Sequence, residues 1–377
     1  MTLAENVFWW SLGFVAYTYA VYPVAVWLLG KFRPQERADS GVMRGWPSVT
    51  VVVAVHNEER RVARKLENLR ALRYEPDKLE IVFVSDGSTD ATKERLRAQP
   101  GVRLLSYRER RGKAYALNYA LARVTSQVIV FTDVRQELEP NAVRFLVARL
   151  RQPGIGAVSG ELVHRKPSTR NAAHIGLYWR YEKWIRQSES RVASTVGATG
   201  ALYAIRRADY VPLPEDAVLD DLEIPMQILR RGRRVVFETR ALAYDELQSH
   251  AGGERRRKVR TLAGNFQAFA HHPWMFSPWH NPVFIQFLSH KVFRLFVPYA
   301  LAAMLGASLA ASGPFYAFAA GAQLFFYAMS CAGMAFHRWR ENRWVSFSVV
   351  FVELNWAAVL ALFNFIGGRL DVRWEKT

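Results

Sequence analysis

Apolar residues gather at the two ends of this chain, and charged residues occupy the middle. The first apolar segment, Val7–Gly30, carries no charge and is long enough to span a bilayer, which takes about 20 residues. Lys31 and Arg33 follow it directly, and basic residues beside a spanning helix favour the cytoplasmic face. A secretory signal peptide is the alternative, but the segment has neither a basic start nor a small-residue cleavage pattern. We therefore predict a retained membrane anchor over residues 1–31.

A second shift in composition begins at His272. Residues 271–291 are rich in Trp, Phe and Pro among scattered polar groups, which is typical of a segment at the membrane interface. Residues 292–368 then hold apolar stretches that are each close to spanning length. These stretches are Val292–Ser312, Pro314–Phe336 and Trp344–Ile366. We predict transmembrane helices there, and therefore at both ends of the chain.

The charges at the C-terminal end conflict with this arrangement. If the middle of the chain is cytoplasmic, three further crossings place Arg369, Arg373 and Lys376 on the outer face, against the positive-inside rule. Either this tail is an exception, or one of the three stretches is interfacial or re-entrant.

The overall charge restricts the possible partners. Lys and Arg number 51 against 33 acidic residues, a formal net charge of +18. Such a basic chain would first suggest nucleic acid. With apolar segments at both ends, we expect instead a basic cytoplasmic surface that meets anionic lipids and phosphorylated substrates, and no nucleic acid. Cys331 is the only cysteine, which excludes an intramolecular disulfide.

Residues 48–270 have the pattern of one α/β domain. The continuous β-branched run Val49–Val55 is typical of a strand buried on both faces of a parallel sheet. Further strands are expected at Glu80–Val84, Val102–Leu105 and Val128–Phe131, with helices at Thr89–Leu96, Lys113–Ala122 and Pro140–Leu150. Strands and helices that alternate in this way predict a mostly parallel sheet with helices on both faces.

Polar side chains follow three of these strands. Asn57 and Glu58 come after the first, Asp86 after the second, and Asp133 after Val128–Phe131. Each has a structural alternative, such as a turn or the N-terminus of a helix. Because ligands bind beyond the carboxyl ends of parallel strands, we predict that the three carboxylates belong to one site.

Three later features extend this predicted site. Lys113 opens a helix directly after Gly112 and could meet a phosphate, or it could belong to a generally basic surface. Asp220 and Asp221 begin another helix, either as capping acids or with one of them as a partly desolvated general base. The basic run 255–260 either faces the membrane or clamps a diphosphate.

Together these motifs resemble the membrane-bound family 2 glycosyltransferases, the branch that includes cellulose, hyaluronan and poly-N-acetylglucosamine synthases. The resemblance covers about residues 48–267 and implies a GT-A-like fold. VVAVHNEE is similar to the family's opening strand and its N-E pair, which implies that Val55, Asn57 and Glu58 bind the donor nucleoside. VSDGSTDAT is similar to D-D-G-S-x-D, with Ser85 in place of the first acid and Asp86 retained.

Three further motifs resemble the same family in the same order. RGKAYALN is similar to the G-K-x-x-A-x-N element and implies that Lys113 binds the donor. GATGALYAIRR is similar to the loop that lines the acceptor site, which implies roles for Gly197 and Gly200. LDDLEIP is similar to the E-D segment, whose second acid is the catalytic base. That acid is Asp221, with Asp220 beside it on the acceptor side.

Two motifs depart from the family. The D-x-D metal motif reads Asp133-Val134-Arg135, and Q-x-x-R-W runs from Arg257 to Thr261 without its Gln and Trp. The resemblance implies Mg²⁺ or Mn²⁺ at Asp133. Arg135 either turns toward Glu137 or Glu139 and leaves Asp133 to hold a weakly bound metal, or meets the diphosphate itself; we expect the first. The missing Trp bears on processivity more than on activity.

The resemblance therefore implies an inverting transferase that moves a sugar from a nucleotide-diphosphate donor to a glycan or lipid-linked acceptor, in extracellular polysaccharide or glycolipid synthesis. Asp133, Arg257 and Arg260 would neutralise the diphosphate, and Asp221 would deprotonate the acceptor. Alternatives are single-sugar transfer to a polyprenyl-phosphate or other lipid carrier, or a non-catalytic membrane assembly subunit, which would have no reason to keep Asp221. We expect a multi-pass protein of the inner cell membrane with a cytoplasmic catalytic domain. Partner subunits stay open.

Overall fold

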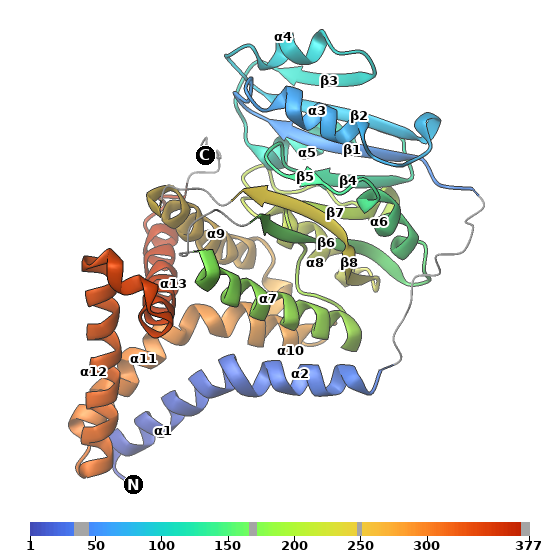
Figure 1. Cartoon of the computed structure of the whole chain (residues 1–377). Helices are drawn as coiled ribbons and strands as arrows, with labels where there is room; N and C mark the ends of the chain where they lie inside the picture. Colours follow the sequence, from blue (N-terminus) through green and yellow to red (C-terminus); the bar gives the residue numbers. More distant parts are fainter. Residues whose placement is uncertain (34–44, 166–171, 247–250, 371–377) are drawn as a thin grey trace.

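The computed structural model describes residues 1–33, 45–165, 172–246 and 251–370. An α/β domain lies beside a group of long apolar helices from the two ends of the chain (Figure 1). The predicted fold class is confirmed.

One mixed sheet forms the centre of the domain. Its strand order within the described residues is β3-β2-β1-β4-β7-β6-β8-β5. The strands are β1 Val49–Val55, β2 Leu79–Asp86, β3 Val102–Tyr107, β4 Val128–Thr132, β5 Glu137–Leu138, β6 Ile155–Arg165, β7 Leu202–Arg206 and β8 Arg234–Glu246. The four strands predicted from the sequence are β1 to β4, and they are parallel. β7 is antiparallel to both β4 and β6, so the second half of the sheet is less regular than predicted.

Helices cover both faces of this sheet. The domain helices are α3 Val62–Arg70, α4 Thr92–Arg97, α5 Lys113–Leu121, α6 Ala142–Leu150, α7 Ala172–Val192, α8 Asp220–Arg230 and α9 Ala251–His271. Alternate residues of β1 point to opposite faces. Val52 accordingly belongs to the core beneath α5, α8 and α9, and Val51 to the core beneath α3 and α6.

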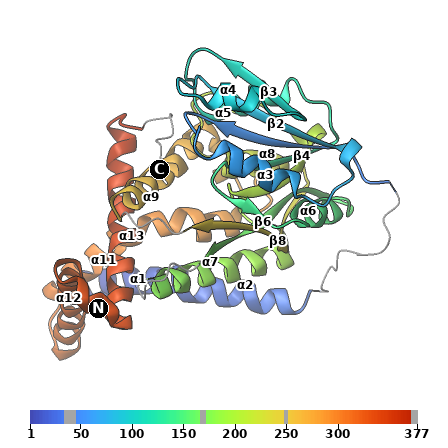
Figure 2. The same cartoon turned by 45° about the horizontal axis from the view of Figure 1, so that its top comes forward.

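Within the described residues, four helical segments are long and apolar enough to cross a membrane. The first segment, Leu3–Lys31, comprises α1 Leu3–Ala16, a short π-helical stretch and α2 Tyr22–Lys31. The second, Phe284–Ala310, contains α10 Phe284–Gln286 and α11 Phe293–Ala310. The other two are α12 Pro314–Ala335 and α13 Arg343–Ile366. The interfacial segment predicted at residues 271–291 stays a prediction, and its last residues belong to the helix that begins at Phe284. Figure 2 shows α1 and α12 meeting at the end away from the domain, where Trp9 Nε1 donates to the Tyr316 hydroxyl at 3.2 Å.

A buried polar network joins the domain to these helices. Tyr22 of α2 donates its hydroxyl proton to Glu189 of α7 at 2.6 Å. His290 lies between Glu189 and Glu182, with its ring nitrogens 2.9 and 2.8 Å from their carboxylates. Since buried carboxylates need such partners, this network fixes how the domain sits on the apolar helices.

Candidate active site

Asp86 shapes the loop that leads into α5. Its side chain is fully buried at the end of β2 and accepts hydrogen bonds from the Tyr107 hydroxyl at 2.9 Å and from the backbone N–H groups of Arg111 and Gly112 at 2.7 and 3.0 Å. Gly112 has a φ of +97°, a conformation that favours glycine. The predicted donor residue Asp86 therefore also sets the position of Lys113.

Lys113 connects the two halves of the site. Its Nζ lies 2.9 Å from Asp133 Oδ1 at the end of β4 and 3.0 Å from Asp220 Oδ1 at the start of α8. Burial opposes the charge, but the two carboxylates outweigh it and raise the pKa of Lys113 above its usual value. The structure thus brings together three predicted residues from separate elements, and the ammonium lies between the predicted donor and acceptor sides.

The two adjacent acids of α8 have different surroundings. Asp220 is buried, and its carboxylate accepts a hydrogen bond from the Tyr203 hydroxyl at 2.8 Å and forms an ion pair with Lys113. Asp221 accepts the backbone N–H of Gly200 at 3.0 Å. Burial and then the charge of Asp220 raise the pKa of Asp221, which makes it the better proton acceptor of the two.

Two glycines of the predicted acceptor loop are required by close approach to Asp221. A Cβ at position 200 would lie 2.9 Å from Asp221 Oδ2. Gly197 has a φ of +89°, and the N–H of Ala198 then donates to the Asp221 carbonyl at 2.7 Å. The loop therefore wraps the end of α8 that carries Asp221, and side chains at either glycine would push it away.

The residues that follow β1 brace the neighbouring loop. Asn57 has a φ of +55°, and its Oδ1 accepts the N–H of Thr89 at 2.7 Å. The carboxylate of Glu58 pairs with Arg61 at 3.0 Å, while Val55 is buried in the sheet. Asn57 and Glu58 thus hold the loops after β1 and β2 together at the predicted donor side.

Arg135 turns to a residue that the sequence did not indicate. Its Nη2 lies 2.8 Å from Asp245 Oδ2 near the end of β8, so the predicted pairing with Glu137 or Glu139 is wrong. Glu137 pairs instead with Arg64 at 2.6 Å. Asp245 lies near the end of β8, a strand of mixed polar and apolar residues that the sequence analysis did not predict. Its ion pair with Arg135 could not be predicted from the spacing of the two residues in the sequence.

A buried lysine supports the loop that carries Asp133. Lys65 of α3 is 2% exposed, and its Nζ donates to Thr132 Oγ1 at 3.0 Å and to the Gln136 carbonyl at 2.6 Å. Burial lowers the pKa of Lys65 to about 7. Sequence reasoning missed this residue, because in an amphipathic helix it looks like one more surface lysine.

Arg257 and Arg260 lie on α9, which follows β8. The Arg257 guanidinium interacts electrostatically with Asp133, Arg135 and Asp245, and desolvation together with Arg135 lowers its pKa. Arg260 is half-buried one turn further along the helix. α9 therefore brings at least one cation of the predicted diphosphate clamp to the donor side.

These residues are a poor donor set for a divalent cation. Asp133 is the one carboxylate at the predicted metal motif, and Lys113 already occupies its Oδ1. Among the described residues, no group of three or more His, Cys, Asp or Glu side chains is arranged to hold a metal ion. Mg²⁺ and Mn²⁺ usually take about six ligands, most of them oxygen atoms. One partly occupied carboxylate does not supply such a set.

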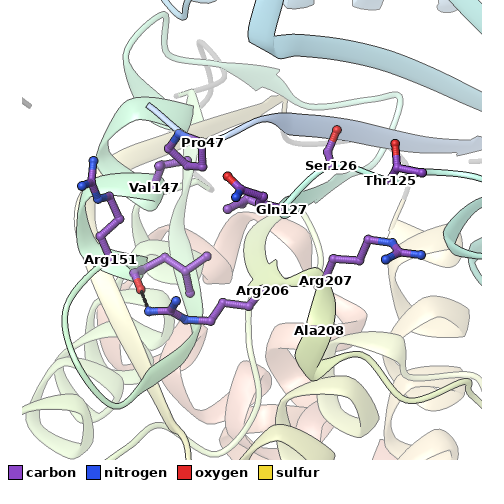
Figure 3. Close-up of a pocket in the computed structure, with 11 residues that line it drawn as sticks. Pro47, Thr125, Ser126, Gln127, Val147, Arg151, Arg206, Arg207 and Ala208 are labelled. Atoms are coloured by element: carbon purple, nitrogen blue, oxygen red, sulfur yellow. Dashed lines mark hydrogen bonds between the residues drawn. The ribbon is translucent and has the colours of Figure 1, made fainter. Parts of the chain in front are cut away.

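A cavity of about 420 Å³ lies at the opposite edge of the sheet (Figure 3). It is lined by Pro47 before β1, by Val128 at the start of β4, and by Arg206 at the end of the antiparallel β7. The Arg206 side chain already forms a hydrogen bond at this cavity, because its Nη2 donates to the Leu150 carbonyl at 2.6 Å. The cavity is therefore separate from the predicted site at the carboxyl ends.

The comparison with known families agrees with the glycosyltransferase type of domain that the motifs predict. Residues 50–210 match the family described as Glycosyl transferase family 2. These residues therefore match the family that the motifs resemble.

Two curated relatives are similar in sequence to more than half of this chain. The poly-beta-1,6-N-acetyl-D-glucosamine synthase of Staphylococcus aureus (strain COL) is 23% identical over 227 residues, which are 58% of this chain and 55% of the synthase. That of Staphylococcus epidermidis is 22% identical over 234 residues, 60% of this chain and 56% of the synthase. The chain spans about half the length of the curated relatives it matches.

A solved structure shows the same fold over nearly the whole chain. It is the mannosyltransferase PcManGT from Pyrobaculum calidifontis, in complex with GDP-Man and Mn²⁺, with a TM-score of 0.72 and 24% sequence identity. The similarity covers 97% of this chain and 100% of that one. The GT-A-like fold with apolar helices at both ends is thus confirmed.

Proposed function

We propose that this protein is an inverting glycosyltransferase that moves a sugar from a nucleoside-diphosphate donor to an acceptor at the membrane. The bridge made by Lys113 carries the proposal. It links Asp133 on the donor side to Asp220, whose neighbour Asp221 is the candidate base. Donor diphosphate and acceptor hydroxyl can therefore meet within the span of one lysine side chain. The family match and the GDP-Man in the related mannosyltransferase support a nucleotide-sugar donor.

The proposed chemistry is a single displacement. The acceptor oxygen forms a bond to the anomeric carbon while the bond from that carbon to the diphosphate oxygen breaks, and its electron pair leaves with the nucleoside diphosphate. Asp221 takes the acceptor proton, for which its raised pKa suits it. The base acts on the face opposite the leaving group, so the anomeric configuration inverts. Because Asp220 is held by Tyr203 and Lys113, it keeps Asp221 positioned.

The acceptor is a glycan or a lipid-linked molecule, and the similarity to poly-N-acetylglucosamine synthases supports extracellular polysaccharide synthesis. The apolar helices support a multi-pass membrane protein. A cytoplasmic domain, as the basic residues after the first helix predict, is part of this proposal. Single transfer to a polyprenyl-phosphate or other lipid carrier is the second candidate, and the absence of the family's Trp at Thr261 favours it over long processive synthesis.

The requirement for Mg²⁺ or Mn²⁺ that the family resemblance implies is not part of this proposal. The Mn²⁺ in the structure of the related mannosyltransferase supports it. The single carboxylate at Asp133 does not, and no step above depends on a metal.

The test is release of nucleoside diphosphate from a panel of nucleotide sugars, UDP-GlcNAc and GDP-mannose among them, by the purified full-length protein with candidate acceptors. Asp221→Asn keeps the shape of the side chain but cannot accept a proton, so we expect turnover to fall about 10²-fold or more while nucleotide binding persists. Asp77→Asn, an exposed acid outside the site, is the matched control. Near-normal turnover of Asp221→Asn would exclude Asp221 as the base. Nucleotide binding without transfer from any donor would favour a non-catalytic assembly subunit.

A further inference from the structure

The two motif positions at which this chain carries an unexpected arginine lie in the same part of the site. Arg135 stands where the resembling family has the second acid of D-x-D, and Arg257 stands where it has the Gln of Q-x-x-R-W. Arg135 follows β4 and Arg257 lies on α9, so the fold brings them together from separate elements. Each difference makes the donor side more positive by at least one charge.

Arg135 is held in a fixed orientation. Its Nη2 donates to Asp245 Oδ2 at 2.8 Å, and Gln136 Nε2 donates to the same oxygen at 3.0 Å. Asp245 is 3% exposed and lies near the end of β8, a few residues before α9 begins. A charge-assisted bond to a buried carboxylate fixes the guanidinium before any ligand arrives.

Arg257 supplies a second cation beside the first. Its guanidinium is within electrostatic range of Arg135, Asp133 and Asp245. The Arg257 side chain is exposed on α9, and among the described residues it forms no hydrogen bond and no ion pair. Two neighbouring guanidinium groups repel each other, and a bound anion with several oxygens relieves that repulsion.

Asp133 is correspondingly a poor single ligand for a metal ion. Lys113 Nζ lies 2.9 Å from its Oδ1, and Arg135 and Arg257 add further positive charge near the carboxylate. A divalent cation at Asp133 would lie among the positive charges of Lys113, Arg135 and Arg257. Arginine offers no lone pair to a metal, so position 135 cannot serve as a ligand.

We propose that Arg135 and Arg257 together bind the diphosphate of the donor and neutralise the negative charge that develops on it as it leaves, so that transfer proceeds without a divalent cation. This inference rests on the proposed glycosyl transfer and specifies how the donor is held. Two guanidinium groups carry the charge of one divalent ion, and their planar N–H donors match phosphate oxygens. When the bond from the sugar to the diphosphate breaks, the electron pair stays on the β-phosphate oxygen. Charges already fixed beside that oxygen lower the barrier.

Binding of nucleoside diphosphates tests this directly. Titration calorimetry with GDP and with UDP on the full-length protein in detergent compares excess EDTA with added Mn²⁺. We expect the affinity for the preferred nucleotide to change by less than about threefold between the two conditions, which is under about 0.7 kcal/mol. Nucleotide binding that disappears in EDTA and returns with Mn²⁺ would overturn the proposal.

Exchange of the two arginines for the family's residues provides the second test. Arg257→Gln should weaken nucleotide binding in EDTA about tenfold or more, because a charge-assisted contact is lost. Arg135→Asp combined with Arg257→Gln places a new carboxylate near Asp133 and Asp245, so we expect Mn²⁺ binding, seen by electron paramagnetic resonance, to appear in the double variant. Arg73→Gln, an exposed arginine after α3, is the control and should change neither property.

Failure of this inference differs from failure of the proposed function. Nucleotide turnover that requires Mn²⁺ in the wild-type protein would refute the metal-free mechanism and leave the glycosyl transfer intact. Tight binding of nucleotide in EDTA without transfer from any donor would support the arginine site and refute the transferase. If the double variant does not fold, the comparison of EDTA with Mn²⁺ on the wild-type protein still decides.

Discussion

Lys65 offers a test of how burial beneath the site translates into stability. Its ammonium is enclosed between α3 and the loop of Asp133, where its partners are Thr132 Oγ1 and the Gln136 carbonyl. Burial lowers its pKa from 10.5 to about 7. Between these two pH values the folded protein binds fewer protons than the unfolded chain, so the free energy of unfolding rises with pH. The whole change corresponds to about 5 kcal/mol at about 1.36 kcal/mol per pKa unit.

Lys65→Met removes this titration. Between pH 7 and 9.5 we expect the wild-type protein to gain about 3 kcal/mol relative to the variant, because close to one proton per pH unit is linked to unfolding. For a domain of this size that gain corresponds to a relative rise in melting temperature of about 6–12 °C. Tryptophan fluorescence during heating, in detergent at a series of pH values, measures it. Lys78→Met, a partly exposed lysine paired with Glu75, is the control.

The difference in melting temperature between wild type and Lys65→Met must therefore grow with pH. Two melting curves that shift in parallel from pH 7 to 9.5 would refute the reasoning, whatever their absolute values. A constant offset is compatible with lost packing or with the unpaired Gln136 carbonyl, but not with a lysine that titrates near pH 7.

Two further predictions concern the acceptor side and the apolar helices. Gly200→Ala places a Cβ 2.9 Å from Asp221 Oδ2, so the loop or the base must shift. We expect turnover to fall about 10²-fold while nucleotide binding is retained. Gly306→Ala is the control and should keep its activity, because a Cβ at position 306 meets open space. In a Cys331→Ser background, a cysteine at Thr377 should react with an impermeant maleimide from the same side of the membrane as a cysteine at Lys78. Labelling from opposite sides would contradict the placement of α13 argued below.

The parallel half of the sheet could be read from the sequence because its signals are local. The run Val49–Val55 is β1, with the bounds that the apolar pattern predicts, and the carboxyl ends of β1, β2 and β4 carry the polar residues of the site. The pairing of Lys113 with both Asp133 and Asp220 was beyond such reasoning, because it depends on how α8 returns to the sheet. The spacing of residues along the sequence indicates which side chains reach the same edge of the sheet. It does not indicate which of two adjacent acids forms the ion pair with Lys113.

The second half of the domain shows the same limit. β7 inserts antiparallel between β4 and β6, and β8 then places Asp245 opposite Arg135. These are long-range pairings between strands whose own sequences look ordinary. Sequence analysis therefore named Glu137 and Glu139, the nearest acids along the chain, as partners for Arg135. The nearest carboxylate in space comes from another strand.

The packing of α13 bears on the conflict over the charged C-terminal tail. The Tyr181 hydroxyl of α7 donates to the Tyr19 carbonyl at 2.7 Å, so Tyr19 lies at the level of the domain, and its ring centroid is 5.6 Å from that of Phe351. Further along α13, Phe365 stacks on Phe266 of α9 with 5.9 Å between ring centroids.

The C-terminal end of α13 therefore lies beside α9, in both views (Figures 1 and 2), while its first half packs on α12, where the ring centroids of Phe351 and Phe326 are 5.7 Å apart. Length and apolar composition alone made Trp344–Ile366 look like another crossing. The contacts with Tyr19 and α9 favour the alternative of an interfacial or re-entrant stretch whose two ends lie on the domain's side, and this placement stays a prediction. Arg338 and Arg340 before α13 and Arg369 after it then share one face with the domain, as the positive-inside rule requires. Arg373 and Lys376 lie outside the described residues.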